Sequence, residues 1–284
     1  MSNPRLRCAQ NDKEGPKGGL KTRPCFHSGT LYTNTVSLFA RNFDFDPAAA
    51  SPGDQRHSVR YRPGAAFPLT AVFSQGGQDW PAQVQNISGV GLGLTLADRH
   101  ADVTAYQLGR VRLTLGTHVQ EFRARVIHIL PRDQGLYCGL ELEFDDFPAQ
   151  KNYLQLVLPV AIGGSLELVA PAEVEQDTPG FVKQVFRGAA DAALTVWRKG
   201  VVTAPVERFE FQADDYLCRG DAGTGRLETS RTEVSGDPSA KPQRSSVSAS
   251  GLQDEIAQLF RWIVPNLSPA VPGDVRAVLQ RVAG

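Results

Sequence analysis

The chain has 284 residues, enough for one large domain or two small ones with tails, and its 27 glycines and 19 prolines favour strands, turns and unfolded segments. Its 30 basic and 30 acidic side chains give a formal net charge of zero, which argues against a general binder of nucleic-acid polymers. The charge is uneven, because residues 1–65 hold ten lysines and arginines against five acidic residues. We expect a local positive field in this part of the chain that attracts an anionic ligand.

The cysteines and histidines show no metal-site pattern. Four cysteines are scattered along the chain without a C-x-x-C pair: Cys8, Cys25, Cys138 and Cys218. The five histidines do not lie near them at the spacing of metal ligands, so we expect no metal site. The N-terminus has basic residues but lacks the apolar core of a secretory signal, which favours reduced thiols and a cytoplasmic location.

One apolar stretch, residues 154–172, contains a single charged residue, Glu167, and is the segment to test as a membrane span. Two prolines and two glycines interrupt it, so its apolar density is too broken for a spanning helix. We expect the end of a helix, a turn and a strand there, and no membrane span.

Residues up to Gly29 show no sustained periodicity, a short apolar patch follows at residues 31–45, and we expect a flexible N-terminal arm over residues 1–53. From Arg60 onward, apolar and polar residues alternate in five short stretches, which is the pattern of strands with one buried face. In the fourth stretch one face is predicted to carry Phe122, Ala124, Val126, His128 and Leu130. Phe147-Pro148 then opens a short helix to about Leu158. The pattern predicts a mainly β fold, with a small antiparallel β-barrel and a C-terminal helix over residues 54–162.

Three further segments follow the barrel. Residues 163–220 are β-rich and form an extension of the barrel or a small second domain, and residues 221–250 have the composition of a flexible linker. Residues 251–284 are predicted to form amphipathic helices, the first opened by a capping box of Ser250 and Gln253. One face of that helix carries Leu252, Ile256, Leu259, Phe260 and Ile263. A helix this short needs a surface that buries its apolar face, either the protein's own β domain or a partner.

Two polar motifs stand out near the start of the barrel. Arg56 and Arg60 form an R-x-x-x-R, and Asn86, Ser88 and Gly91 form an N-x-S-x-x-G. An arginine fork binds a phosphate or a guanine edge with two bonds and also stacks on bases. An amide and a hydroxyl in a strand-end turn face base edges or sugar, and glycine lets the backbone approach closely. The two motifs together suit a ligand that carries both phosphates and purine edges.

In this order and at this spacing, the two motifs resemble those of the PilZ domain, a bacterial receptor family for the second messenger cyclic di-GMP. The resemblance covers about residues 54–160 and includes the strand patterns at residues 91–94 and 139–144. It implies a barrel closed by a helix, with cyclic di-GMP as a ligand and no cofactor. The ligand contacts that it implies come from Arg56, Arg60, Asn86, Ser88 and Gly91. It also implies that nucleotide binding changes the conformation and regulates a protein partner in motility, biofilm or exopolysaccharide control.

The first motif departs from the family in one respect. Family members often carry a doubled arginine at its start, where this chain has Gln55, and this leaves the nucleotide stoichiometry open. Arg62 lies nearby and either supplies the missing contact or is a solvated residue at the start of a strand. The alternative function is a PilZ-like interaction scaffold that does not bind nucleotide. The chain contains no G-x-S-x-G, H-E-x-x-H or P-loop motif, and we expect no enzyme.

Overall fold

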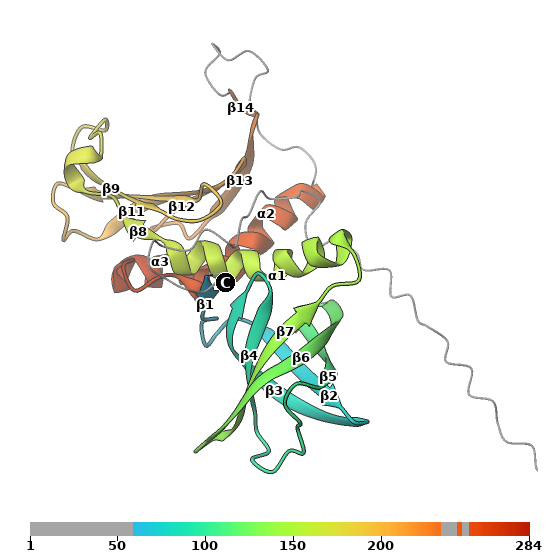
Figure 1. The fold of residues 1–284 in the computed structure, drawn as a ribbon. Helices are drawn as coiled ribbons and strands as arrows, with labels where there is room; N and C mark the ends of the chain where they lie inside the picture. The colour runs from blue at the N-terminus through green and yellow to red at the C-terminus, as the bar shows by residue number, and fades with distance from the viewer. Residues whose placement is uncertain (1–58, 234–242, 246–249) are drawn as a thin grey trace, which may run out of the picture. The chain divides into compact units, whose positions relative to one another are not determined.

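The computed structural model describes residues 59–233, 243–245 and 250–284 (Figure 1). All of the described residues belong to one compact unit. The predicted arm of residues 1–53 and the first motif arginine, Arg56, lie outside the described residues.

The first sheet is a closed antiparallel barrel. Its strand order is β1-β3-β2-β5-β6-β7-β4, and β4 also pairs with β3, so that 6 strands close on themselves while β1 adds to β3. The strands are β1 (Arg60–Tyr61), β2 (Leu69–Gln75), β3 (Gln78–Ser88), β4 (Gly91–Leu96), β5 (Leu108–Leu115), β6 (His118–Arg132) and β7 (Gly135–Glu143). This topology confirms the small antiparallel barrel predicted from the sequence.

Alternate side chains of these strands fill the barrel interior, as the period of two requires, and Phe73, Leu94 and Leu113 are completely buried. Helix α1 (Phe147–Ser165) follows the barrel, and the Oδ1 atom of Asp146 caps it by accepting a 2.7 Å hydrogen bond from the backbone N–H of Ala149. Burial raises the pKa of Tyr153, on α1, well above its usual value. Its protonated hydroxyl donates to two carbonyl oxygens of the β3–β4 turn, and this joins α1 to the barrel.

Helix α1 is longer than the sequence predicts. It does not end near Leu158 but continues through Pro159 to Ser165, so the turn expected within residues 154–172 begins later. Proline removes a backbone donor, which normally interrupts a helix. Here residues 155–163 are buried without a break, so tertiary packing holds the helical conformation.

The second sheet is a seven-stranded antiparallel meander, in which each strand pairs with the next in the chain, in the order β14-β13-β12-β11-β10-β9-β8. Its strands are β8 (Glu167–Leu168), β9 (Phe181–Arg187), β10 (Ala193–Lys199), β11 (Val206–Ala213), β12 (Tyr216–Asp221), β13 (Leu227–Glu233) and β14 (Gln243–Ser245), with a 3-10 turn η1 (Pro171–Glu173) after β8. The linker predicted over residues 221–250 is therefore wrong where β13 and β14 form. The low apolar content of this segment hid both strands, because the backbone pairing of β13 with β12 and of β14 with β13 needs no apolar side chain.

The C-terminal segment folds into α2 (Ser250–Ile263), the 3-10 turn η2 (Val264–Asn266) and α3 (Gly273–Ala283). The predicted apolar face of α2 is covered by the chain itself, since α2 contacts α1, β12 and β13 (Figure 1). Phe260 stacks on Phe209 with ring centroids 5.6 Å apart and also contacts Phe211. Of the two surfaces left open by the sequence, the protein's own β domain is the one used.

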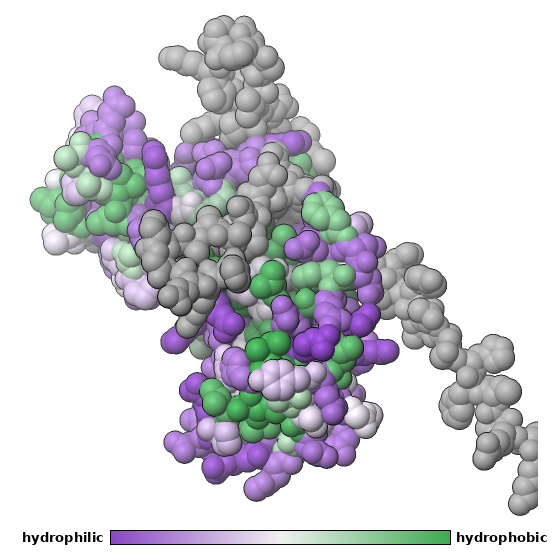
Figure 2. Space-filling view, in the orientation of Figure 1, coloured by the Kyte–Doolittle hydropathy of each residue, from purple (hydrophilic) through white to green (hydrophobic). Residues whose placement is uncertain are grey.

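Among the described residues, no helix is both long enough and apolar enough to cross a membrane. Hydrophilic and hydrophobic side chains are interspersed over the barrel strands on the face shown in Figure 2.

Candidate functional site

A pocket of about 850 Å³ opens on the outer face of the barrel. It is lined by residues of β1, β3, β4, β6 and β7 and of the segments that follow β1 and β6. These residues are Arg60, Arg62, Gln85, Asn86, Thr95, His128, Leu130, Arg132, Asp133, Gln134 and Tyr137. Within the described part of the chain, the three arginines make no ion pair. With three arginines against one acidic residue, Asp133, the pocket lining has an excess of positive charge together with amide and aromatic groups.

Strand β1 places the second motif arginine at this pocket. Arg60 and Tyr61 pair with Ser88 and Ile87 of β3, and because successive residues of a strand face opposite sides, Arg60 is exposed while Tyr61 is half-buried. Arg62 follows directly and also lines the pocket. Both arginines can thus reach an anion there.

An irregularity in β3 orients Asn86. The register of β3 against β4 shifts between Val84 and Asn86, and Gln85 and Asn86 then both line the pocket. Asn86 Nδ2 donates a 3.2 Å hydrogen bond to Tyr137 Oη. Gly93 lies opposite Asn86, and a Cβ atom on Gly93 would overlap both groups. The absence of a side chain at Gly93 leaves the space in which the amide and the phenol meet.

The pocket also contains an aromatic group that the sequence analysis missed. The centroid of the Tyr137 ring lies 5.5 Å from the centroid of the His128 ring. The guanidinium carbon of Arg132 lies 5.0 Å from the same Tyr137 centroid. Gly139 lies opposite His128, and a Cβ atom there would overlap the imidazole. Rings and guanidinium planes of this kind stack on nucleobases.

A second strand irregularity, in β6, explains why the sequence pattern did not place His128 at the pocket. The sequence pattern assigned His128 and Leu130 to the same face as the core residue Val126, and this assignment is wrong. The register of β6 against β7 shifts between Val126 and His128. The extra residue sends His128 and Leu130 to the outer face, where they line the pocket, and Ile129 packs against the core instead.

The remaining motif residues, Ser88 and Gly91, are not part of the pocket lining. Ser88 is buried, its Oγ donates a 3.2 Å hydrogen bond to the carbonyl oxygen of Gly91, and its own carbonyl accepts from Tyr153. Gly91 begins β4, and a Cβ atom there would overlap the carbonyl oxygen of Leu140. Ser88 and Gly91 thus fix the β3–β4 turn that follows Asn86. The structure brings Arg60 and Asn86 together at the pocket, while Ser88 and Gly91 do not line it.

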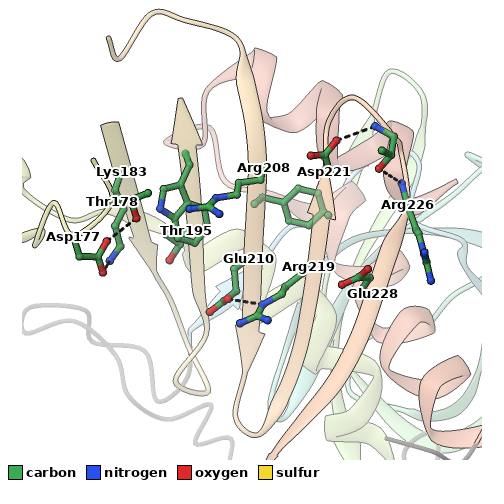
Figure 3. A pocket seen from close by; sticks show the side chains of 14 residues that line it. Asp177, Thr178, Lys183, Thr195, Arg208, Glu210, Arg219, Asp221, Arg226 and Glu228 are labelled. Carbon is green, nitrogen blue, oxygen red and sulfur yellow. Dashed lines mark hydrogen bonds and ion pairs between the residues drawn. The ribbon is translucent and has the colours of Figure 1, made fainter. Parts of the chain in front are cut away.

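A second pocket, of about 770 Å³, lies on one face of the second sheet (Figure 3). Lys183 is paired with Asp177 at 3.0 Å and Arg219 with Glu210 at 2.8 Å, so these cations are already neutralised. The guanidinium of Arg208 stacks over the Trp197 ring at 4.7 Å. This balance of charges contrasts with the barrel pocket, and we assign no ligand to the second pocket.

The described residues contain no group of three or more histidine, cysteine, aspartate or glutamate side chains that could hold a metal ion. Cys138 and Cys218 are buried free thiols, and burial raises their pKa values to about 11 and about 12. Both thiols therefore remain protonated near neutral pH and are poor nucleophiles.

The sequence of the barrel and of most of its helix matches a known domain family. The family model of the PilZ domain matches residues 54–158. This segment of the chain is a PilZ domain. The match spans the barrel strands, the arginine motif, the N-x-S-x-x-G motif and most of α1.

Solved structures similar to this chain include three that contain c-di-GMP. The PilZ domain of YcgR from Escherichia coli matches at 13% identity and a TM-score of 0.34 over 37% of this chain and 90% of that chain. MrkH from K. pneumonia matches at 16% identity and a TM-score of 0.32 over 38% of this chain and 52% of that one. PlzA from Borreliella burgdorferi matches at 9% identity and a TM-score of 0.27 over 70% and 93% of the two chains. No curated protein matches the chain.

Proposed function

We propose that this protein is a receptor for cyclic di-GMP and that the barrel pocket is its binding site. The observation that carries the proposal is the meeting of Arg60, Asn86 and Tyr137 in one pocket of a PilZ domain, with two further arginines that make no ion pair among the described residues. A cyclic dinucleotide presents two phosphates and two guanine bases, and these groups match arginine forks, an amide and stacking planes.

Each pocket residue has a proposed role. Arg60, together with Arg56, contacts phosphate and the guanine edge. Arg62 supplies the contact that is lost because this chain has Gln55 in place of the family's additional arginine. Asn86 faces a base edge or sugar, while Ser88 and Gly91 hold the turn that follows it. Tyr137, His128 and Arg132 provide the stacking surface. The nucleotide is a ligand, and the role of the protein is recognition and not catalysis.

The output that we propose is a change of conformation in the segment that carries the arginines. Binding would fix Arg56 and Arg60 on the nucleotide, which changes the surface next to β1 that a protein partner meets. By family resemblance, the process regulated through that partner is motility, biofilm formation or exopolysaccharide production. A reducing cytoplasmic compartment agrees with the two free thiols, Cys138 and Cys218.

Isothermal titration calorimetry of the full chain with cyclic di-GMP tests the proposal, with GTP as the comparison ligand. We expect saturable binding of cyclic di-GMP at tens of micromolar or below and much weaker binding of GTP, which lacks the second guanine. No detectable cyclic di-GMP binding in this range would favour the interaction-scaffold alternative.

A further inference from the structure

The segment that carries the pocket arginines is held by a residue more than two hundred positions away. Asn266, in η2, is buried, and its Oδ1 accepts a 2.8 Å hydrogen bond from the backbone N–H of Gly64. The Nδ2 of the same side chain donates a 2.7 Å bond to the carbonyl oxygen of Trp262. The amide of Asn266 therefore links the chain just after Arg62 to the end of α2 through both of its polar atoms.

The backbone around Asn266 is packed so closely that neither Gly64 nor Gly163 has room for a side chain. A Cβ atom on Gly64 would overlap the carbonyl oxygen of Pro265, and a Cβ atom on Gly163 of α1 would lie 2.9 Å from the Cβ of Asn266. The backbone N–H of Ser268 donates a 2.9 Å bond to the carbonyl oxygen of Gly163. The arginine segment, α1 and η2 thus meet backbone to backbone around Asn266.

Other contacts of the arginine segment come from β1 and from Phe67, and the half-buried Tyr61 packs against the core. Strand β1 has only 2 residues, so Arg60 and Tyr61 form a short ladder with β3. On the other side, the carbonyl oxygen of Gly64 accepts a 2.9 Å bond from the N–H of Phe67, which is buried in the core. Arg60 lies within the β1 ladder, Arg62 lies between that ladder and Gly64, and the bond from Gly64 to Asn266 follows on the C-terminal side of both arginines.

We propose that Asn266 is a positioning residue for nucleotide binding: it fixes Gly64 and so holds Arg60 and Arg62 at the barrel pocket. The inference rests on the proposed function, since it concerns affinity at that same pocket. A segment that is only partly in its binding-competent position lowers the apparent affinity by the fraction that is competent. By linkage, nucleotide bound to the held segment also stabilises the docking of the C-terminal helices.

The test compares two substitutions of Asn266 in the full chain. Asn266→Leu removes the acceptor for Gly64, and we expect cyclic di-GMP to bind about tenfold more weakly in calorimetry, a factor that equals about 1.4 kcal/mol. Asn266→Asp keeps an acceptor for Gly64 but loses the donor to Trp262, so it is expected to lose stability while binding the nucleotide within about threefold of wild type. If Asn266 had only a structural role, the cyclic di-GMP affinity of each variant would fall in proportion to its loss of stability.

Gln120→Leu is the matched control. Gln120 is a buried amide on β6 that donates to the carbonyl oxygen of Asn152 on α1, away from the arginine segment. We expect unchanged nucleotide affinity in this variant. Equal affinities for wild type, Asn266→Leu and Gln120→Leu would overturn the inference while leaving the receptor proposal standing.

Hydrogen exchange gives a readout that needs no ligand. In the apo protein, deuterium uptake over residues 60–67 is expected to rise in Asn266→Leu and to stay at the wild-type level in Gln120→Leu. If wild type bound no cyclic di-GMP, the receptor proposal would fail, and the exchange result would still decide whether Asn266 holds the segment. Unchanged uptake in Asn266→Leu would refute the positioning role.

Discussion

Asn86 and Tyr137 meet across an intervening strand: the Asn86 Nδ2 on β3 reaches the Tyr137 Oη on β7 at 3.2 Å, over Gly93 of β4. Strands β3 and β7 both pair with β4, so the two residues are second neighbours in the barrel. The hydrogen bond fixes the Asn86 amide and the Tyr137 ring relative to each other. A base edge and a base face would be met by groups already in place, which lowers the entropic cost of binding.

Gly93→Ala tests this arrangement. The added Cβ would overlap both Asn86 Nδ2 and Tyr137 Oη, so we expect cyclic di-GMP to bind at least about tenfold more weakly, with a loss of about 1–3 kcal/mol in the free energy of unfolding from overpacking. Calorimetry and urea unfolding measure the two effects.

Gly251→Ala is the control for this substitution, because no atom lies within 4 Å of a Cβ built at Gly251 in α2. There we expect unchanged affinity and a gain of about 0.5–1 kcal/mol in the free energy of unfolding, as alanine replaces glycine in a helix. Wild-type affinity in Gly93→Ala would show that the Asn86–Tyr137 contact plays no part in recognition.

Arg132→Ala tests the stacking surface. The Arg132 guanidinium lies over the Tyr137 ring and makes no ion pair among the described residues, so its removal costs charge and stacking area in the pocket. We expect a loss of about 1–2 kcal/mol in binding free energy. The change in unfolding free energy should remain within about 0.5 kcal/mol, because Arg132 is exposed. A variant that binds as wild type does would remove Arg132 from the proposed site.

The Phe260 ring anchors α2 on the second sheet. Phe260→Ala removes the stacking on Phe209 and the contact with Phe211 and leaves a cavity, so we expect the unfolding free energy to fall by about 3–5 kcal/mol. The control is Val201→Ala at an exposed position, where the change should stay within about 0.5 kcal/mol. A loss in Phe260→Ala no larger than the control value would mean that α2 is not held by this contact.

The ion pair between Arg198 of β10 and Asp274 of α3 makes stability depend on pH. The hydrogen bond from Arg198 lowers the pKa of Asp274 below its usual value in the folded state. A carboxyl whose folded pKa is lowered stabilises the fold above its unfolded pKa, about 4, and this contribution is lost as the pH falls through the folded value.

Asp274→Asn measures that contribution. Since the Asp274 side chain is 55% exposed, solvent screens the pair, and we expect a loss of only about 0.5–1 kcal/mol at pH 7. The difference between wild type and variant should disappear in urea unfolding below the folded pKa of Asp274. A difference that persisted unchanged into strong acid would show that the charge of Asp274 is not its source.

The sequence predicted the elements whose signal is local. The two-residue alternation along β2, β5 and β7 predicted the barrel, and the helical spacing of Ile256, Leu259 and Ile263 predicted α2. Strand β13 was missed because its stability comes from pairing with β12, and α1 was placed too short because its burial overrides Pro159.

The site was only partly predictable for a related reason. The motif pair pointed to Arg60 and Asn86, whereas His128 reached the pocket through a register shift in β6 that no periodicity reveals. Asn266 carries no motif at all, and its contact with Gly64 exists only in the folded chain. Contacts between residues distant in sequence are set by packing, which a single sequence does not display.

Calorimetric titration of Arg60→Ala with cyclic di-GMP, beside wild type and Arg110→Ala, decides whether the barrel pocket binds the nucleotide. Arg110 is an exposed arginine on the same barrel that pairs with Glu121 at 3.4 Å, so it controls for the loss of one positive charge. We expect Arg60→Ala to lose about 1–3 kcal/mol of binding free energy and Arg110→Ala to bind as wild type does. Equal affinities for all three proteins would contradict the assignment of the barrel pocket as the nucleotide site.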